Sequence, residues 1–387
     1  MRSMNRLHII VVGLLLCLVA CNSKPELERP LVSINDEDIS YVSDSLVQDI
    51  IDSVSFIPLE ESTEILLGDI RKIQKENNEF FVMAEGSNRM PEVYRFSQDG
   101  HFLNKIGRLG NSRSEYVRIG SFFVLDDKVY VADLNKNRIL IYHINGEFVD
   151  CNENNENIKF LHDMIAIDHN KALFSYDINF SDDNSLYEIV DLNTFNRIHS
   201  ISTVYKAVGS FPFSMKEINF DGENLLLSFP FDNCIYTLDK ETFTLNKILS
   251  PALWGTIPSF KVNDYDEIQK ILEETEINLL CGFYVSNKKI LLNSIQGSIL
   301  WYSDLGKGVC LKDEVDMGKM KQFPFLPLSV CYADQEGFYS VFSGDSFTSI
   351  LQKASPVVLK SNLFFDKINP EHEYANPVIV EYKIKSL

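Results

Sequence analysis

A short apolar hairpin that recurs along the chain constrains its fold most strongly. The clearest copy, KVYVADLNKNRILIYHINGEF at residues 128–148, has two apolar strands around a polar turn and ends in an Asn145-Gly146 turn. Related units read NEFFVMAEGSNRMPEVYRFSQDGHF, KALFSYDINFSDDNSLYEIVDLNTF, NLLLSFPFDNCIYTLDKETF, KILLNSIQGSILWYSDLGKG and EGFYSVFSGDSFTSILQ. Another apolar segment precedes each unit, and most of these segments end in an Asp, Asn or Gly turn signal.

The spacing of the units is typical of propeller blades. Central strands follow one another at intervals of about 43 to 65 residues. A four-stranded antiparallel blade with short turns needs about that length. A single blade would leave its sheet faces exposed, so blades must pack face to face around an axis. We therefore predict an all-β fold, a six-bladed β-propeller over residues 52–387.

Two lone strands flank the repeats. VSFIPLE (54–60) precedes the first complete unit, and NPVIVEYKI (376–384) follows the last. We predict that these strands pair in the sixth blade and close the ring. Two stacked sheets built from the same strands are the alternative, which explains the regular spacing and the lone end strands less well.

One segment breaks the rhythm of the repeats. NDYDEIQKILEETEINLL (263–280) has a helical pattern, with Ile268, Ile271 and Leu272 on one face. Asp264 and Glu267 have the spacing of a capping box. We predict a short helix inserted between blades four and five, which serves either as a lid or partner surface or as a cover for a blade edge.

The N-terminal segment indicates export. Arg2 and Arg6 precede an apolar run that is too short to span a bilayer and suits a signal peptide. The run ends in Leu18-Val19-Ala20-Cys21, which resembles the lipobox of bacterial lipoproteins. The resemblance implies a signal peptide at 1–20, lipid on Cys21 and a polar tether and lead-in at 21–51. It also implies a membrane anchor in the bacterial cell envelope, at the outer membrane. A signal peptide without lipidation is the alternative.

Segment 106–148 carries a family resemblance. Gly107 and Gly110, Tyr116, the VYVAD strand and Asn137-Arg138 resemble an NHL-type propeller repeat. From about residue 52 to 385, the chain resembles the six-bladed propeller lipoproteins of Bacteroidetes. The matching motifs are Ile-Pro-Leu-Glu at 57–60 and Asn-Pro-Val at 376–378. The family's Gly-Pro-Gly-Glu-Tyr loop is Asn-Ser-Arg-Ser-Glu-Tyr here, at 111–116. These motifs imply a fold, but propellers host many unrelated functions.

Charge and composition limit the chemistry. A formal net charge of −19 disfavours nucleic-acid binding. Five widely spaced cysteines remain after Cys21, without a C-x-x-C pair, so neither a disulfide framework nor a zinc site is indicated. His162-Asp163 and Asp168-His169 flank the strand MIAI at opposite ends, and we interpret them as separate turn residues. We predict no metal and no cofactor.

Candidate ligand groups lie in the turns between the second and third strands of each predicted blade. We expect these turns to share one rim of the ring. The loop before blade two should join them there. The residues predicted to bind a ligand are Arg113, Glu115, Tyr116, Arg118, Asp133, Arg138, Asp177 and Asp232. Such a mixture suits a glycan or a peptide, although each residue is also an ordinary turn former.

Together these observations predict a membrane-anchored, extracytoplasmic propeller that acts as a binding or scaffold module. Its expected partners are the membrane, through Cys21, and a glycan, a peptide or an envelope protein; the glycan derives from the family resemblance. The alternative is a hydrolase or lyase with its active site at the mouth of the central channel. An assembly subunit would instead display a contiguous exposed apolar patch.

Overall fold

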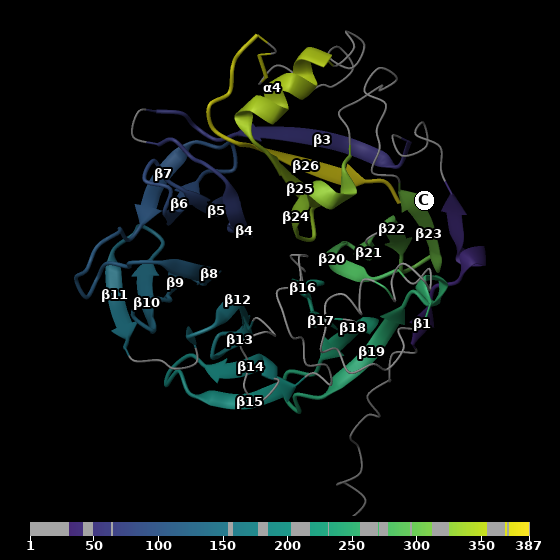
Figure 1. Ribbon diagram of the computed structural model, residues 1–387, viewed down its shortest axis with the longest axis horizontal. Coiled ribbons are helices and arrows are strands. Elements are labelled where there is room, and N and C mark those ends of the chain that lie inside the picture. The colour runs from purple at the N-terminus through teal and green to yellow at the C-terminus, as the bar shows by residue number, and fades with distance from the viewer. Residues whose placement is uncertain are drawn as a thin grey trace, which may run out of the picture.

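The computed structural model describes residues 31–41, 49–62, 65–153, 158–176, 185–202, 217–230, 232–255, 270, 278–294, 296–311, 325–353, 368–369 and 371–386. Their strands form six sheets arranged in a ring, as Figure 1 shows. The prediction of a six-bladed β-propeller is therefore confirmed. Among the described residues, no helix has the length and apolar character needed to cross a bilayer.

The first three blades each contain four consecutive antiparallel strands. Blade one comprises β4 (Ile70–Glu76), β5 (Glu79–Glu85), β6 (Pro91–Phe96) and β7 (Phe102–Ile106). Blade two comprises β8 (Ile119–Leu125), β9 (Lys128–Asp133), β10 (Arg138–His143) and β11 (Phe148–Asn152). Blade three comprises β12 (Leu161–Asp168), β13 (Lys171–Tyr176), β14 (Ser185–Asp191) and β15 (Arg197–Ser202).

Blades four and five each gain a fifth strand from the N-terminal part of the chain. Blade four comprises β16 (Ile218–Phe220), β17 (Leu225–Phe229), β18 (Asp232–Leu238) and β19 (Leu245–Ser250). Blade five comprises β20 (Leu280–Ser286), β21 (Lys289–Ser294), β22 (Gly297–Tyr302) and β23 (Lys307–Leu311). The additions are β1 (Val32–Ser33), parallel to β19, and β2 (Ile39–Tyr41), parallel to β23. They cover the outer edges of these two sheets, which would otherwise expose unpaired backbone groups.

Blade six joins the two ends of the ring. It comprises β24 (Val330–Ala333), β25 (Phe338–Phe342), β26 (Val378–Ile384) and β3 (Ile51–Pro58). β3 pairs antiparallel with β26, with Ile57 opposite Ile379 and Phe56 opposite Val380. All four side chains are buried. The predicted pairing of the two lone strands is therefore confirmed.

Three short 3₁₀ helices and one α-helix accompany the strands within the described residues: η1 (Asp36–Asp38), η4 (Ala252–Trp254), η6 (Pro327–Ser329) and α4 (Gly344–Lys353). α4 connects β25 to β26 at the outer edge of blade six (Figure 1). It packs Phe347 against Phe56 and Tyr374. The helix predicted at 263–280 lies outside the described residues, apart from Lys270 and residues 278–280.

The apolar core lies between neighbouring blades. Nearly all residues of β5, β9, β17 and β21 are buried, because both faces of each sheet are covered. Phe81 of blade one and Phe122 of blade two, for example, belong to one buried cluster. Edge strands such as β15 are largely exposed. This arrangement explains the continuous apolar runs that mark the second and third strands of each repeat.

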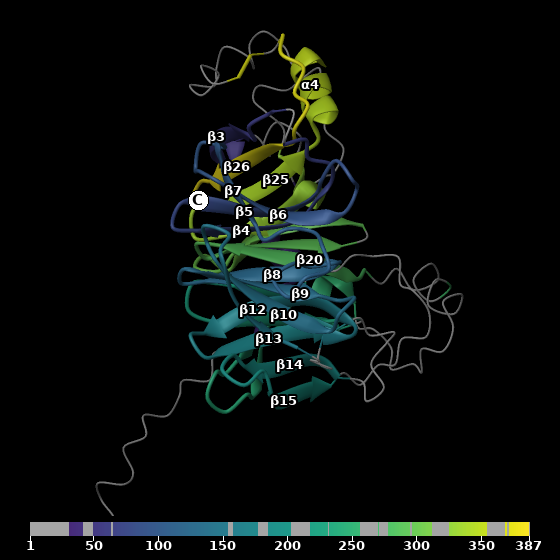
Figure 2. The same ribbon diagram turned by 90° about the vertical axis from the view of Figure 1, so that its left-hand side faces the viewer.

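The strand order defines two faces of the ring. The mouth face carries the turns between second and third strands, such as 134–137, and the connections into first strands, such as 107–118. The back face carries the turns at 126–127 and 144–147. Figure 2 shows the ring edge-on, with the back face on the left. Because β1 runs parallel to β19, Leu31 lies at the back face.

Candidate functional site

A polar cavity opens at the mouth of the central channel. Its volume is about 360 Å³. The innermost strands of all six blades contribute to its wall: Lys72 from β4, Ser121 from β8, Asp163 from β12, Ile218 from β16, Tyr284 from β20 and Cys331 from β24. The cavity is therefore a property of the closed ring and not of any single blade.

Bulges in the innermost strands aim side chains into this cavity. The pairing of β4 with β5 shifts register between Ile70 and Lys72, and that of β12 with β13 shifts between Leu161 and Asp163. Similar irregularities occur at the mouth ends of β8, β20 and β24. A bulge leaves a residue unpaired and redirects its side chain. Arg71 and His162 occupy such positions and line the cavity.

Lys72 joins three blades at the cavity wall. Its ammonium donates to Ser121 Oγ at 3.1 Å and to the Met164 carbonyl at 2.8 Å, and it forms an ion pair with Asp163. Ser121 Oγ in turn donates to Asp163 Oδ1 at 2.7 Å. The cluster is largely buried, so it holds the first strands of blades one to three at a fixed spacing.

Other ionisable groups border the cluster. Arg71 pairs with Glu85 at 2.6 Å, and Glu217 and the exposed imidazole of His162 line the same cavity. Burial raises the pKa of Tyr284 well above its ordinary value, so this phenol stays neutral. Within the described ranges, no three His, Cys, Asp or Glu side chains gather where they could hold a metal ion. The mouth therefore offers hydrogen-bonding and charged groups of both signs.

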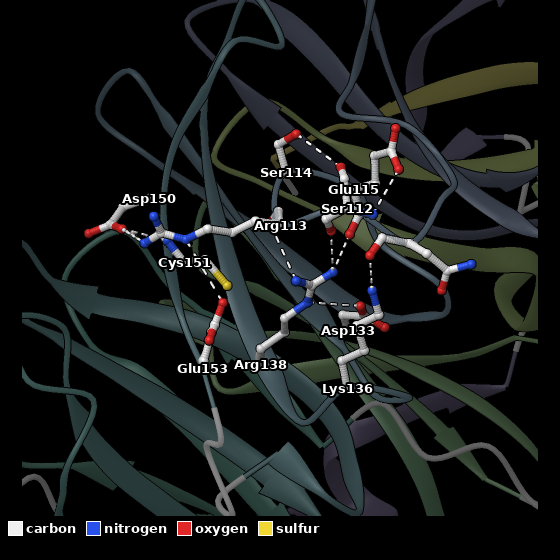
Figure 3. Close-up of polar contacts among 11 residues, drawn as sticks. Ser112, Arg113, Ser114, Glu115, Asp133, Lys136, Arg138, Asp150, Cys151 and Glu153 are labelled. Atoms are coloured by element: carbon white, nitrogen blue, oxygen red, sulfur yellow. Dashed lines mark hydrogen bonds and ion pairs between the residues drawn. The ribbon is translucent and has the colours of Figure 1, made fainter.

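The residues predicted from the loop before blade two do come together, but mostly in an enclosed network (Figure 3). Arg138 and Asp133 form an ion pair at 3.2 Å, with side chains only 5% and 0% exposed. The Arg138 guanidinium also donates to the carbonyls of Ser112 at 3.2 Å and Arg113 at 3.3 Å, and to that of Glu115. These contacts hold the loop 112–115 against blade two.

The remaining loop residues support the same network. The Arg118 backbone N–H donates to Asp133 Oδ1 at 3.1 Å, and the Tyr116 ring is fully buried. Hydrogen bonds from Ser112 and Arg108 lower the pKa of the Glu115 carboxyl. The Glu115 carboxylate lies against Gly110, where a Cβ would come within 2.1 Å of it. A side chain at this position would have to displace the Glu115 carboxylate from Arg108 and Ser112.

The side chains of three predicted residues are not placed in that network. The Arg113 side chain is 65% exposed and reaches Asp150 at 3.3 Å (Figure 3). Asp232 begins β18 in blade four, where it accepts a hydrogen bond from Tyr236. Asp177 lies outside the described residues. Of the predicted ligand residues in the loop, Arg113 and Arg118 are exposed, and the Arg113 guanidinium is held by Asp150 and Glu153.

The interpretation of His162-Asp163 as turn residues was wrong. Both lie within β12 and face the channel, because the bulge at the start of this strand turns them inward. Asp168 and His169, at the other end, pair separately with Lys171 at 3.1 Å and Asp126 at 3.0 Å. The signal in the sequence is a polar residue near the start of the first apolar segment of a repeat: Lys72, Ser121, Asp163 and Glu217.

Fold and cavity together define a single-chain, six-bladed β-propeller with a polar channel mouth. Residues 32–383 match the family described as "Domain of unknown function (DUF4934)". The chain belongs to this family. No curated protein matches it.

Solved structures share the fold. A Bacteroides fragilis protein whose name describes it as exported is 16% identical, with a TM-score of 0.66 over 92% of this chain and 100% of that one. A member of the DUF4221 family from Bacteroides vulgatus is 13% identical, with a TM-score of 0.54 over 87% of this chain and 98% of that one. At such identities the likeness concerns architecture alone.

Proposed function

We propose that the chain is a lipid-anchored, extracytoplasmic binding module that holds a glycan or a peptide at the mouth of its channel. The observation that carries this proposal is the cavity of about 360 Å³ whose wall comes from the innermost strands of all six blades. Bulges aim polar groups into it, and the Lys72 cluster holds three of these strands together. Preorganised polar groups in a concave site are what specific recognition requires.

The chemistry of the mouth suits a polar ligand. Asp163 and Glu217 supply acceptors for hydroxyl or amide hydrogens, and Arg71 and His162 supply donors. Mixed charge favours a neutral or zwitterionic molecule over a polyanion. The loop network of blade two does not line this cavity, and the buried Arg138 and Asp133 would act by positioning the loop.

The proposed location rests on two observations. The lipobox-like Leu-Val-Ala-Cys sequence follows a signal-like apolar run, and the similar Bacteroides fragilis structure is named as an exported protein. The topology adds an orientation. Leu31 lies at the back face, so a tether from Cys21 would direct the mouth face away from the membrane.

A glycan and peptide array tests the proposal directly. The protein would be residues 31–387, which include every described strand. We expect selective retention of at least one ligand and loss of that signal in His162→Ala, whose exposed side chain lines the cavity. An array without hits, or hits that His162→Ala retains in full, would count against a binding site at the mouth. Mass spectrometry of the bound ligand would reveal turnover, which the hydrolase or lyase alternative requires.

A further inference from the structure

We propose that the chain carries a second ligand site, a pocket for a phosphate group, on its back face between blades five and six. This pocket has a volume of about 390 Å³. The turn after β20, the turn after β24 and the adjoining ends of β3 and β26 form its wall. It lies on the opposite face from the channel mouth and shares no lining residue with it.

Lys289, the first residue of β21, is the group that points to a ligand. The residue is only 7% exposed and lines the pocket. Within the part of the chain that the structure describes, its ammonium has neither a hydrogen bond nor an ion pair. Its nitrogen reaches the solvent of the pocket, because it is not among the fully buried side-chain atoms of the described residues that lack a hydrogen-bond partner. An anion in the pocket would supply the partner that this ammonium lacks within the described residues.

The other charges around the pocket favour an anion. Lys383 and Lys385 also line it, and among the described residues the Lys385 ammonium donates only to a neutral partner, the Asp49 carbonyl, at 2.9 Å. The acidic lining residues are Asp52 and Glu336. Glu336 is already bound by Lys75 at 2.5 Å. Lys75 as well as Lys383 lowers the pKa of the Glu336 carboxyl. The lysines of the pocket without a carboxylate partner among the described residues are therefore Lys289 and Lys385, in a chain whose formal net charge is −19.

A phosphate group matches this set of donors. Lysine ammonium groups bind phosphate as point charges, and several can approach its oxygens from different directions. The hydroxyl-bearing residues Ser286 and Ser386 also line the pocket. Because Leu31 lies at the same face, the phosphate could belong to a lipid headgroup as well as to a soluble molecule.

Isothermal titration of the full chain with inorganic phosphate, at ionic strength held constant with chloride, tests the site. We expect one phosphate per chain and at least tenfold weaker binding in Lys289→Met. The matched control is Lys288→Gln, which removes the same charge from the neighbouring exposed position of the turn and should bind within twofold of wild type. Without phosphate, Lys289→Met should melt close to wild type, because Lys289 makes no side-chain hydrogen bond or ion pair within the described residues.

The source of the phosphate is tested by competition with glycerophosphoglycerol, a soluble headgroup diester. If glycerophosphoglycerol displaces inorganic phosphate at a similar concentration, the result would support a lipid headgroup. If the site binds inorganic phosphate but not the diester, the result would support a soluble ligand. The proposal is overturned if wild type binds no phosphate, or if Lys289→Met and Lys288→Gln bind it equally well. Neither result would bear on ligand binding at the channel mouth.

Discussion

Two polar clusters on the mouth face contain similar residues but have different roles. In blade two, Arg138 and Asp133 are 5% and 0% exposed, and their partners belong to one neighbouring loop. At the channel, Lys72 and Asp163 are 13% and 18% exposed, and their partners come from three blades. The first cluster stabilises a loop; the second shapes a cavity that solvent reaches. Burial and strand order, rather than residue type, therefore separate a supporting group from a candidate ligand group.

The largest effect should come from Arg138→Met. This change leaves Asp133 buried without its ion-pair partner and removes one donor from each of three loop carbonyls. We expect the free energy of unfolding to fall by about 3–5 kcal/mol. Urea denaturation followed by tryptophan fluorescence measures it. Arg113→Gln, which removes an exposed arginine from the same loop, should cost less than about 1 kcal/mol. Equal costs for the two variants would mean that burial does not distinguish the supporting Arg138 from the exposed Arg113.

Lys72→Met should destabilise less, by about 2–3 kcal/mol, because the cluster at the channel is partly open to water. Combining it with Asp163→Asn should cost less than the sum of the two single changes, since the charges act as a pair. The same denaturation experiment supplies all three values. Strict additivity would mean that Lys72 does not tie blade one to blade three.

Ser121→Ala tests the same channel cluster and should have a smaller effect on stability. Ser121 is buried, and its hydroxyl links Lys72 to Asp163. Loss of these bonds should cost about 1–2 kcal/mol. Ser114→Ala, on the loop of blade two, is a suitable comparison because within the described ranges the Ser114 hydroxyl contacts only that of Ser112, at the surface. We expect Ser114→Ala to leave the free energy of unfolding nearly unchanged. A cost as large as that of Ser121→Ala would contradict the placement of the Ser114 hydroxyl at the surface.

The smallest effect concerns pH and Glu115. Hydrogen bonds from Ser112 and Arg108 lower the pKa of this carboxyl below 4.5, its ordinary value. Its stabilising contribution is therefore complete above about pH 4.5 and is lost as the pH falls through the lowered pKa. Melting temperatures between pH 7 and pH 3 should show a slightly shallower decline for Glu115→Gln than for wild type. An identical decline would mean that the loop does not hold Glu115 ionised.

The propeller ring could be predicted well from the sequence, because the same pattern occurs in every blade. Each blade repeats the same apolar hairpin, and the two lone strands have matching apolar faces, as in the pairs Ile57–Ile379 and Phe56–Val380. The cavity could not be predicted in the same way. A shift of one residue at a bulge decides which side chain faces the channel, and apart from the polar residue itself nothing in IRKIQ or LHDMIAI marks the shift. Likewise, the charges at 133 and 138 are visible in the sequence, but the loop that buries them is not.

The most direct test of the account compares one ligand on two variants. With a glycan or peptide retained on the array, dissociation constants would be measured for wild type, His162→Ala at the channel mouth and Arg113→Ala on the loop of blade two. We predict at least tenfold weaker binding for His162→Ala and a change within twofold for Arg113→Ala. If Arg113→Ala weakened binding more than His162→Ala did, the ligand site would lie at the rim of blade two, which would contradict a ligand site at the channel.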